Sequence, residues 1–364
     1  MMFYYLSEFR QIFFIFNVFR YITFRAAMAT VTTFLFCMIF GPIVINKFKS
    51  WKIHEHLKRE DCPELDHYRS IKKGTPTMGG IFMIGGIIFS IFLWCDLSNR
   101  FVQLTLLSCT WLALLGLFDD YVKLTRSHKG KRGMRARNKF IWQCILGGIV
   151  GFVIYSDPQI STRLDIPFLK NCVIHLGFLY IPFAIIVIVG TSNAVNLTDG
   201  LDGLAIGCVL IATLGLAVLS YISGHLKFSE YLLIPYIPQA GELAIICAAI
   251  LGASMGFLWF NCYPASIFMG DVGSLSLGGT LGVIAVLIKK EILLVLLGGV
   301  FVIEALSVIL QVTSFKLRRK RLLKVSPLHH HLQLSGWNES KIIIRFWIIA
   351  IILVFLTLTT LKIR

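Results

Sequence analysis

Long apolar runs without a single ionised side chain are the feature that most constrains this chain. Two of the clearest extend from Asn171 to Thr198 and from Leu243 to Gly270, and neither contains Asp, Glu, Lys or Arg. Each run exceeds the ~20 residues that an α-helix needs to cross a bilayer. Only 15% of all residues are charged, whereas soluble domains average ~25%. The sequence therefore predicts an all-α polytopic membrane protein.

About ten transmembrane helices are expected, packed as a single integral membrane domain that covers residues 1–364. Their expected ranges are 22–45, 78–97, 101–118, 140–156, 173–191, 203–222, 240–259, 267–288, 292–315 and 342–361. Residues 1–21 are rich in Phe but carry Glu8, Arg10 and Arg20. Because charge interrupts their apolar character, we interpret them as an interfacial lead-in rather than a cleaved signal peptide.

Two further features concern groups inside the membrane. Glu304 falls within the ninth expected span, where a charge is costly, so its side chain should face the protein interior. The 9 cysteines are scattered, mostly in apolar runs and without CxxC spacing. That distribution favours small packing residues over a disulfide framework or a zinc site.

Basic residues are concentrated in three loops, those after the first, third and ninth expected spans. They are Lys47, Lys49, Lys52, Lys58, Arg59, Arg69, Lys72 and Lys73; Lys123, Arg126, Lys129, Lys131, Arg132, Arg135, Arg137 and Lys139; and Lys316, Arg318, Arg319, Lys320, Arg321 and Lys324. The positive-inside rule places these odd-numbered loops in the cytoplasm, and ten spans then put both termini outside. The net charge of +16 is therefore mostly a one-sided surface, suited to anionic lipid or an anionic substrate. Nucleic-acid binding is not expected, because the loops lack interleaved aromatic residues.

Five polar clusters stand out, and every one falls on the side of the odd-numbered loops. They are Lys72–Gly80 (KKGTPTMGG), Phe118–Lys123 (FDDYVK), Asn193–Gly203 (NAVNLTDGLDG), Phe260–Ser274 (FNCYPASIFMGDVGS) and Ser326–Gln333 (SPLHHHLQ). Five clusters placed at random would share a side only about one time in 16, by alternation of the spans. The sequence therefore predicts one composite site, a cleft at the cytoplasmic face.

The carboxylates of these clusters indicate phosphate and metal chemistry. Asp119, Asp120, Asp199, Asp202 and Asp271 supply the hard oxygen ligands that Mg²⁺ prefers beside substrate phosphates. Asp199 and Asp202 are three residues apart and share one face of a helical turn. Asp119 and Asp120 are neighbours, about 100° apart on a helix, so they should not easily reach one ion and are expected to have different roles. For each acid, the ordinary alternative is a structural role in a helix cap or a turn. The location of all five acids on one side of the membrane weakens that alternative.

Four motifs resemble those of a known family of membrane enzymes. FDDYVK, NAVNLTDGLDGLA, FLWFNCYPASIFMGDVGSLSLGG and SPLHHHLQLSGW resemble the motifs of the phospho-N-acetylmuramoyl-pentapeptide transferase (MraY) family, in the polyprenyl-phosphate N-acetylhexosamine-1-phosphate transferase superfamily. The resemblance extends from the basic loop after the first span to the terminal RFWIIAIILV segment. It implies ten transmembrane helices, a cytoplasmic active-site cleft, a homodimer and residence in the bacterial inner membrane.

The resemblance also implies a reaction. Phospho-MurNAc-pentapeptide would pass from UDP-MurNAc-pentapeptide to undecaprenyl phosphate in a Mg²⁺-dependent step that yields lipid I and UMP. This is the first membrane step of peptidoglycan synthesis, and it would link the protein to cell wall biogenesis, cell shape and cell division.

Site residues are carried over motif by motif from the same resemblance. Catalytic roles fall on Asp119, Asp120, Asp271, His329 and His330. The nucleotide and its phosphates would be bound by Lys72 or its neighbour Lys73, Thr77, Lys139, Asn196, Asp199, Asp202, Asn261 and Phe268. Of these, Phe268 would stack on uracil. Mg²⁺ would be held by Asp271, Asp199 and Asp120.

Several alternatives stay open. A sister enzyme that transfers GlcNAc-1-phosphate to the same carrier is the nearest, although the uninterrupted histidines of SPLHHHL favour the muramoyl-pentapeptide branch. A transporter or flippase for an anionic lipid would need acids near the bilayer midplane and interrupted helices, and Glu304 is the main mid-span acid. The transfer itself could be a direct displacement, helped by Asp119 or Asp120, or a two-step reaction through a phosphorylated aspartate.

Overall fold

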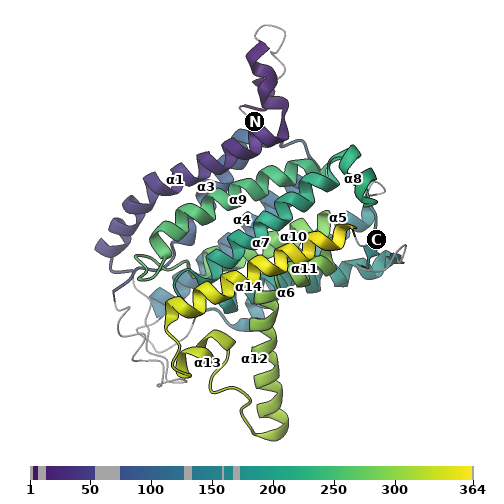
Figure 1. Ribbon diagram of the computed structural model, residues 1–364. Coiled ribbons are helices and arrows are strands. Elements are labelled where there is room, and N and C mark those ends of the chain that lie inside the picture. The colour runs from purple at the N-terminus through teal and green to yellow at the C-terminus, as the bar shows by residue number, and fades with distance from the viewer. Residues whose placement is uncertain are drawn as a thin grey trace.

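The computed structural model describes residues 3–6, 14–53, 74–126, 133–157, 160–166 and 173–362. Within these segments the chain is a bundle of helices with one short β-hairpin (Figure 1). Nine of the described helices are long and apolar enough to cross a membrane. They are α1 (Ile22–Ser50), α4 (Arg100–Arg126), α5 (Ala136–Ser156), α6 (Tyr180–Thr198), α7 (Leu204–Ser223), α9 (Ala240–Asn261), α10 (Gly270–Leu287), α12 (Gly299–Arg318) and α14 (Glu339–Thr359). The predicted class, an all-α polytopic membrane protein, is confirmed.

The remaining predicted span, 78–97, forms a shorter apolar helix, α3 (Gly80–Trp94). Its 15 residues extend about 22 Å, less than the ~30 Å hydrocarbon core of a bilayer. The backbone N–H of Gly79 donates to the carbonyl of Phe268 at 2.8 Å. The start of α3 is thereby joined to the loop that precedes α10.

The ninth predicted span, 292–315, is wrong as a single helix. The structure breaks it at Gly298 into α11 (Glu291–Leu297) and α12. Figure 1 shows α12 leaving the bundle at a steep angle to the neighbouring helices. A pair of glycines, Gly298 and Gly299, stands at the break, which is a common cause of a sharp kink. The apolar pattern continues across the break, so hydropathy could not reveal it.

The fifth predicted span, 173–191, also needs correction at its start. Val173–His175 forms strand β2, paired antiparallel with β1 (Arg163–Asp165), and α6 begins only at Tyr180. A short apolar run does not distinguish a strand from a helix, so the run alone could not place this boundary. The other short elements are η2 (Phe14–Arg20), η5 (Gly177–Leu179), α8 (Leu226–Leu232), α13 (Leu328–Leu334) and η6 (Thr360–Lys362). Of the predicted lead-in, η2 is the main described part.

Helix α10 is the centre of the bundle, and 94% of its residues are buried. It packs against α4, α6, α3 and α7, and the four surrounding helices cover nearly all of its side chains. Small residues in the segment GDVGSLSLGGTLG allow these neighbours to approach closely, as in many membrane helix pairs. The N-terminus of α10 is therefore held rigidly at one end of the bundle.

A buried ion pair closes the opposite end. The Arg25 guanidinium, with a side chain 2% exposed, donates to both carboxylate oxygens of Glu242 at 2.9 and 2.5 Å. It also donates to the Trp94 carbonyl at 3.1 Å, and the Asp96 N–H donates to Glu242 at 3.0 Å. The first turns of α1 and α9 and the end of α3 are joined by these bonds.

Replacing Arg25 with Ala should destabilise the fold by about 3–5 kcal/mol, because Glu242 would remain buried without its counter-charge. Denaturant unfolding in mixed micelles measures the change. The double variant Arg25→Ala/Glu242→Ala should lose clearly less than the sum of the two single losses. Unfolding of Arg25→Ala at the wild-type midpoint would contradict this account.

Candidate active site

The polar clusters predicted from the sequence meet at the end of the bundle opposite Arg25. The backbone N–H of Phe268 donates to the Pro76 carbonyl at 2.8 Å, which joins the first cluster to the fourth. The Asn196 amide donates to Asp271 at 3.0 Å, which joins the third to the fourth. The second cluster contributes two aspartates to the same place, and the fifth reaches it through α13.

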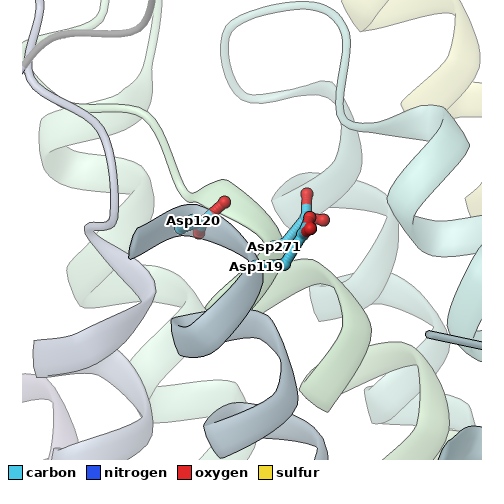
Figure 2. A group of neighbouring side chains, drawn as sticks. All are labelled: Asp119, Asp120 and Asp271. Atoms are coloured by element: carbon cyan, nitrogen blue, oxygen red, sulfur yellow. The ribbon is translucent and has the colours of Figure 1, made fainter. Parts of the chain in front are cut away.

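Three aspartates form the centre of this end. Asp119 and Asp120 lie near the end of α4, and Asp271 lies in the first turn of α10. One carboxylate oxygen from each lies within 4.8 Å of those from the other two (Figure 2). Their side chains are only 4%, 5% and 13% exposed. Among the described residues, this is the group of His, Cys, Asp and Glu side chains whose geometry could hold a metal ion.

Two lysines neutralise much of this negative charge. The Lys123 ammonium lies 3.0 Å from Asp119, 3.1 Å from Asp120 and 3.0 Å from Asp271. The Lys139 ammonium lies 3.3 Å from Asp119 and forms a second ion pair with Asp271. Lys139 was predicted from the family resemblance, whereas Lys123 was not assigned a role.

The position of Lys123 corrects one expectation from the sequence. Asp119 and Asp120 do reach one cation, because Lys123 follows them by four and three residues. Side chains at both spacings are neighbours on a helix surface, so the ammonium lies over the gap between the two acids. The spacing of FDDYVK could have indicated this pairing.

The backbone around the acids leaves room for them only because two residues are glycine. A Cβ at Gly116 of α4 would stand 2.3 Å from the carbonyl oxygen of Asp271, so α4 and α10 touch backbone to backbone. Gly270 has φ +74, and a Cβ there would stand 2.6 Å from an oxygen of Asp120. The left-handed conformation is open to glycine at little cost. It turns the chain into α10, whose N-terminal dipole favours the Asp271 carboxylate.

Fixed donors hold the three carboxylates in place. The Met134 N–H donates to Asp119 at 2.7 Å, and the Val272 N–H donates to Asp120 at 3.3 Å. Asn196 donates to Asp271 and, at 2.8 Å, to the Ser274 hydroxyl. The acids are thus oriented by groups on α10, α6 and the segment before α5.

Two predicted nucleotide-side residues brace loops in this structure. Both ends of the Asn261 amide are used: its oxygen accepts from the Gly203 N–H at 3.0 Å, and its nitrogen donates to the Ile267 carbonyl at 2.8 Å. Asp202 accepts from the Ala265 N–H at 3.0 Å. Asn261 and Asp202 are each 4% exposed. Together they join the turn before α7 to the loop before α10.

The other residues predicted to bind the nucleotide or the metal differ in burial and in their distance from the three aspartates. Thr77 is buried beside α3, and Phe268 is half-buried, with its backbone bonded to the first cluster. Asp199 is half-buried at the end of α6 and lies outside the group of three aspartates that could share an ion. Lys72 and Lys73 lie outside the described residues.

The histidines form a layer behind the Asp199–Gly200 turn. His329 is fully buried, and its Nδ1 lies 3.1 Å from a carboxylate oxygen of Glu304 on α12. A Cβ at Gly200 would stand 2.3 Å from the Nε2 of His329, so the ring packs directly on this turn. His330 is half-buried, and its Nδ1 lies 2.9 Å from the Gln333 side chain. The prediction that Glu304 faces the interior is confirmed by its zero exposure.

Comparison with known proteins finds a matching family model and closely similar sequences. Residues 102–289 match the model of Glycosyl transferase family 4. A protein of Citrifermentans bemidjiense is 52% identical over 350 residues, which cover 96% of each chain. One of Desulforapulum autotrophicum is 49% identical over the whole of both chains, and one of Thermodesulfovibrio yellowstonii is 51% identical over 96% of each. All three are named phospho-N-acetylmuramoyl-pentapeptide-transferase.

Replacing Gly116 with Ala should push α4 away from α10, because the added methyl meets backbone atoms that cannot move independently. Overpacking of this kind typically costs 1–3 kcal/mol, and the separation of the aspartates should also lower activity. Thermal unfolding and turnover in detergent measure both effects.

Gly190→Ala is the matched control, since nothing lies within 4 Å of a Cβ there. Alanine is favoured over glycine in a helix interior by roughly 0.5–1 kcal/mol, so this variant should be as stable as the parent or more so. Equal behaviour of the two variants would contradict the close approach of α4 and α10.

Proposed function

The chain belongs to the phospho-N-acetylmuramoyl-pentapeptide transferase family and is a transferase, and from this premise we propose its full reaction. UDP-MurNAc-pentapeptide donates phospho-MurNAc-pentapeptide to undecaprenyl phosphate, and the products are lipid I and UMP. The observation that carries the proposal is the group of Asp119, Asp120 and Asp271, which meets two lysines at the N-terminus of α10. Phosphoryl transfer needs mainly positioning and charge neutralisation, and this arrangement offers both.

The donor set fits a magnesium ion. Three carboxylate oxygens within 4.8 Å of one another are the hard ligands that Mg²⁺ takes, together with water and substrate phosphates. Asp119, Asp120 and Asp271 would hold the ion, and the geometry favours Asp119 over Asp199 as the third member. Magnesium bound there would neutralise charge on the diphosphate and on the leaving UMP.

The protein's own groups have distinct tasks in this reaction. The phosphate of the lipid carrier attacks the β-phosphorus of the UDP-sugar, and the bond to UMP breaks. Lys139, paired with Asp119 and Asp271, lies where it can stabilise charge on the transferred group. Asp119 or Asp120 positions the lipid phosphate or removes its proton. Phe268, Asn196 and the loop braced by Asn261 provide the remote binding energy that fixes the geometry.

The orientation of the protein in the membrane is argued from basic residues at the ends of two helices. Lys47 and Lys49 lie in the last turn of α1, and Lys316 and Arg318 lie in the last turn of α12. The positive-inside rule assigns such basic ends to the cytoplasm, where a UDP-linked substrate is available. We therefore propose that the protein lies in the bacterial inner membrane with the aspartates facing the cytoplasm. The homodimer that the family resemblance implies stays a prediction.

The direct test is synthesis of lipid I by the purified protein in detergent, with UDP-MurNAc-pentapeptide and undecaprenyl phosphate. Product should form with Mg²⁺ and disappear with EDTA, and Asp271→Asn should lower turnover by at least about 100-fold, since a charge-stabilising group is lost. Asp96→Asn, at the opposite end of the bundle, is the control and should remain active. UDP-GlcNAc as the preferred donor, or full activity of Asp271→Asn, would refute the proposal.

The direct route is separated from the covalent route by omitting the lipid acceptor. We expect no UMP release and no phospho-sugar adduct on the protein when the enzyme is incubated with UDP-MurNAc-pentapeptide and Mg²⁺ alone. Rapid quenching and mass spectrometry of the protein provide the measurement. A phospho-sugar adduct on an aspartate would establish the two-step reaction instead.

A further inference from the structure

We propose that Lys123 is an internal counter-ion that competes with the divalent cation for the three aspartates and moves to the substrate phosphates when the cation binds. The inference rests on the proposed function for its metal site. It assigns a role to a residue that the motif-based assignment leaves out.

The competition follows from the contacts of one nitrogen atom. The Lys123 ammonium contacts one oxygen from each of Asp119, Asp120 and Asp271, at 3.0, 3.1 and 3.0 Å. An ammonium has three donors, and here three carboxylates lie within ion-pair distance of it. A divalent ion on the same three oxygens would bind at about 2.0–2.1 Å, within the volume that the ammonium fills. The two cations would also repel each other, so they cannot share the site.

The lysine is the mobile partner and the acids are the fixed ones. Backbone N–H groups and Asn196 hold the carboxylates, as described above. The Lys123 side chain is 42% exposed, whereas that of Lys139 is 17% exposed. A four-carbon stem near a helix end can swing outward without disturbing the fold. Displacement of Lys123 would therefore leave a preorganised set of three oxygens.

The exchange would also change the charge of the site. With all three carboxylates ionised, the group that they form with the ammonium ions of Lys123 and Lys139 has a net charge of −1. Exchange of the Lys123 ammonium for a divalent cation makes the net charge of the acids, Lys139 and the ion zero. The displaced ammonium adds a further positive charge close by, which favours a diphosphate anion. The displaced ammonium stays within reach as a point-charge phosphate ligand. Lys123 would thus disfavour metal binding in the empty enzyme and favour it when substrate is present.

The experiment measures Mn²⁺ binding to the full-length protein in detergent without substrate, by electron paramagnetic resonance of free Mn²⁺. Lys123→Met should bind Mn²⁺ on the order of tenfold more tightly than the parent, because no ammonium has to leave first. Lys123→Gln is the second variant in case Met impairs folding, and Lys123→Arg should bind no more tightly than the parent. Lys49→Met removes an exposed charge in the last turn of α1 and should leave the affinity unchanged.

The addition of UDP-MurNAc-pentapeptide provides a second readout. Substrate should increase Mn²⁺ affinity in the parent and have a smaller effect in Lys123→Met, since the released ammonium is missing. Unchanged or weaker Mn²⁺ binding by both Lys123→Met and Lys123→Gln would overturn the inference while leaving the metal site in place. If Asp271→Asn binds Mn²⁺ as the parent does, the metal site of the proposed function fails instead.

Discussion

Mutual repulsion among three buried carboxylates is the constraint on which the active end of this protein depends. Asp119, Asp120 and Asp271 lie close together at the edge of an apolar bundle, where water cannot screen them fully. Such a group persists only with nearby cations and fixed donors. Lys123 and Lys139 supply the positive charge, and the N-terminus of α10 adds its dipole. The same environment would attract a divalent ion and phosphate groups.

The bundle converts this local requirement into a rigid site. Helix α10 is surrounded on nearly every side, so its first turn cannot shift relative to α4 and α6. Gly116 permits the contact between α4 and α10, and Gly270 turns the preceding loop into the helix. Behind the Asp199–Gly200 turn, the buried pair of His329 and Glu304 supports the wall of the site from α12 and α13. The ring of His329 therefore supports this turn by packing against Gly200.

Asn261 and Asp202 belong to predicted binding motifs, and in the structure their side chains hold two loops together. Their polar atoms are used within the protein, and they set the shape of the two loops beside the aspartates. Phe268 and the segment around Thr77 are held to each other by backbone bonds. These motif residues thus shape the site through bonds within the protein.

The sequence by itself determined the all-α membrane class and most of the long spans, and it grouped the polar clusters at one end of the bundle, because hydropathy, charge and motifs are local properties of the chain. It did not determine the break at Gly298 or the β-hairpin at Val173–His175, since the apolar pattern is the same on either side of a kink or a strand boundary. Only the tertiary structure decided that Asp119 joins Asp120 and Asp271, that Lys123 lies among them, and that Glu304 pairs with His329. These pairings join residues on different helices, or depend on how a side chain bends over one turn, and distances of that kind arise only when the helices pack.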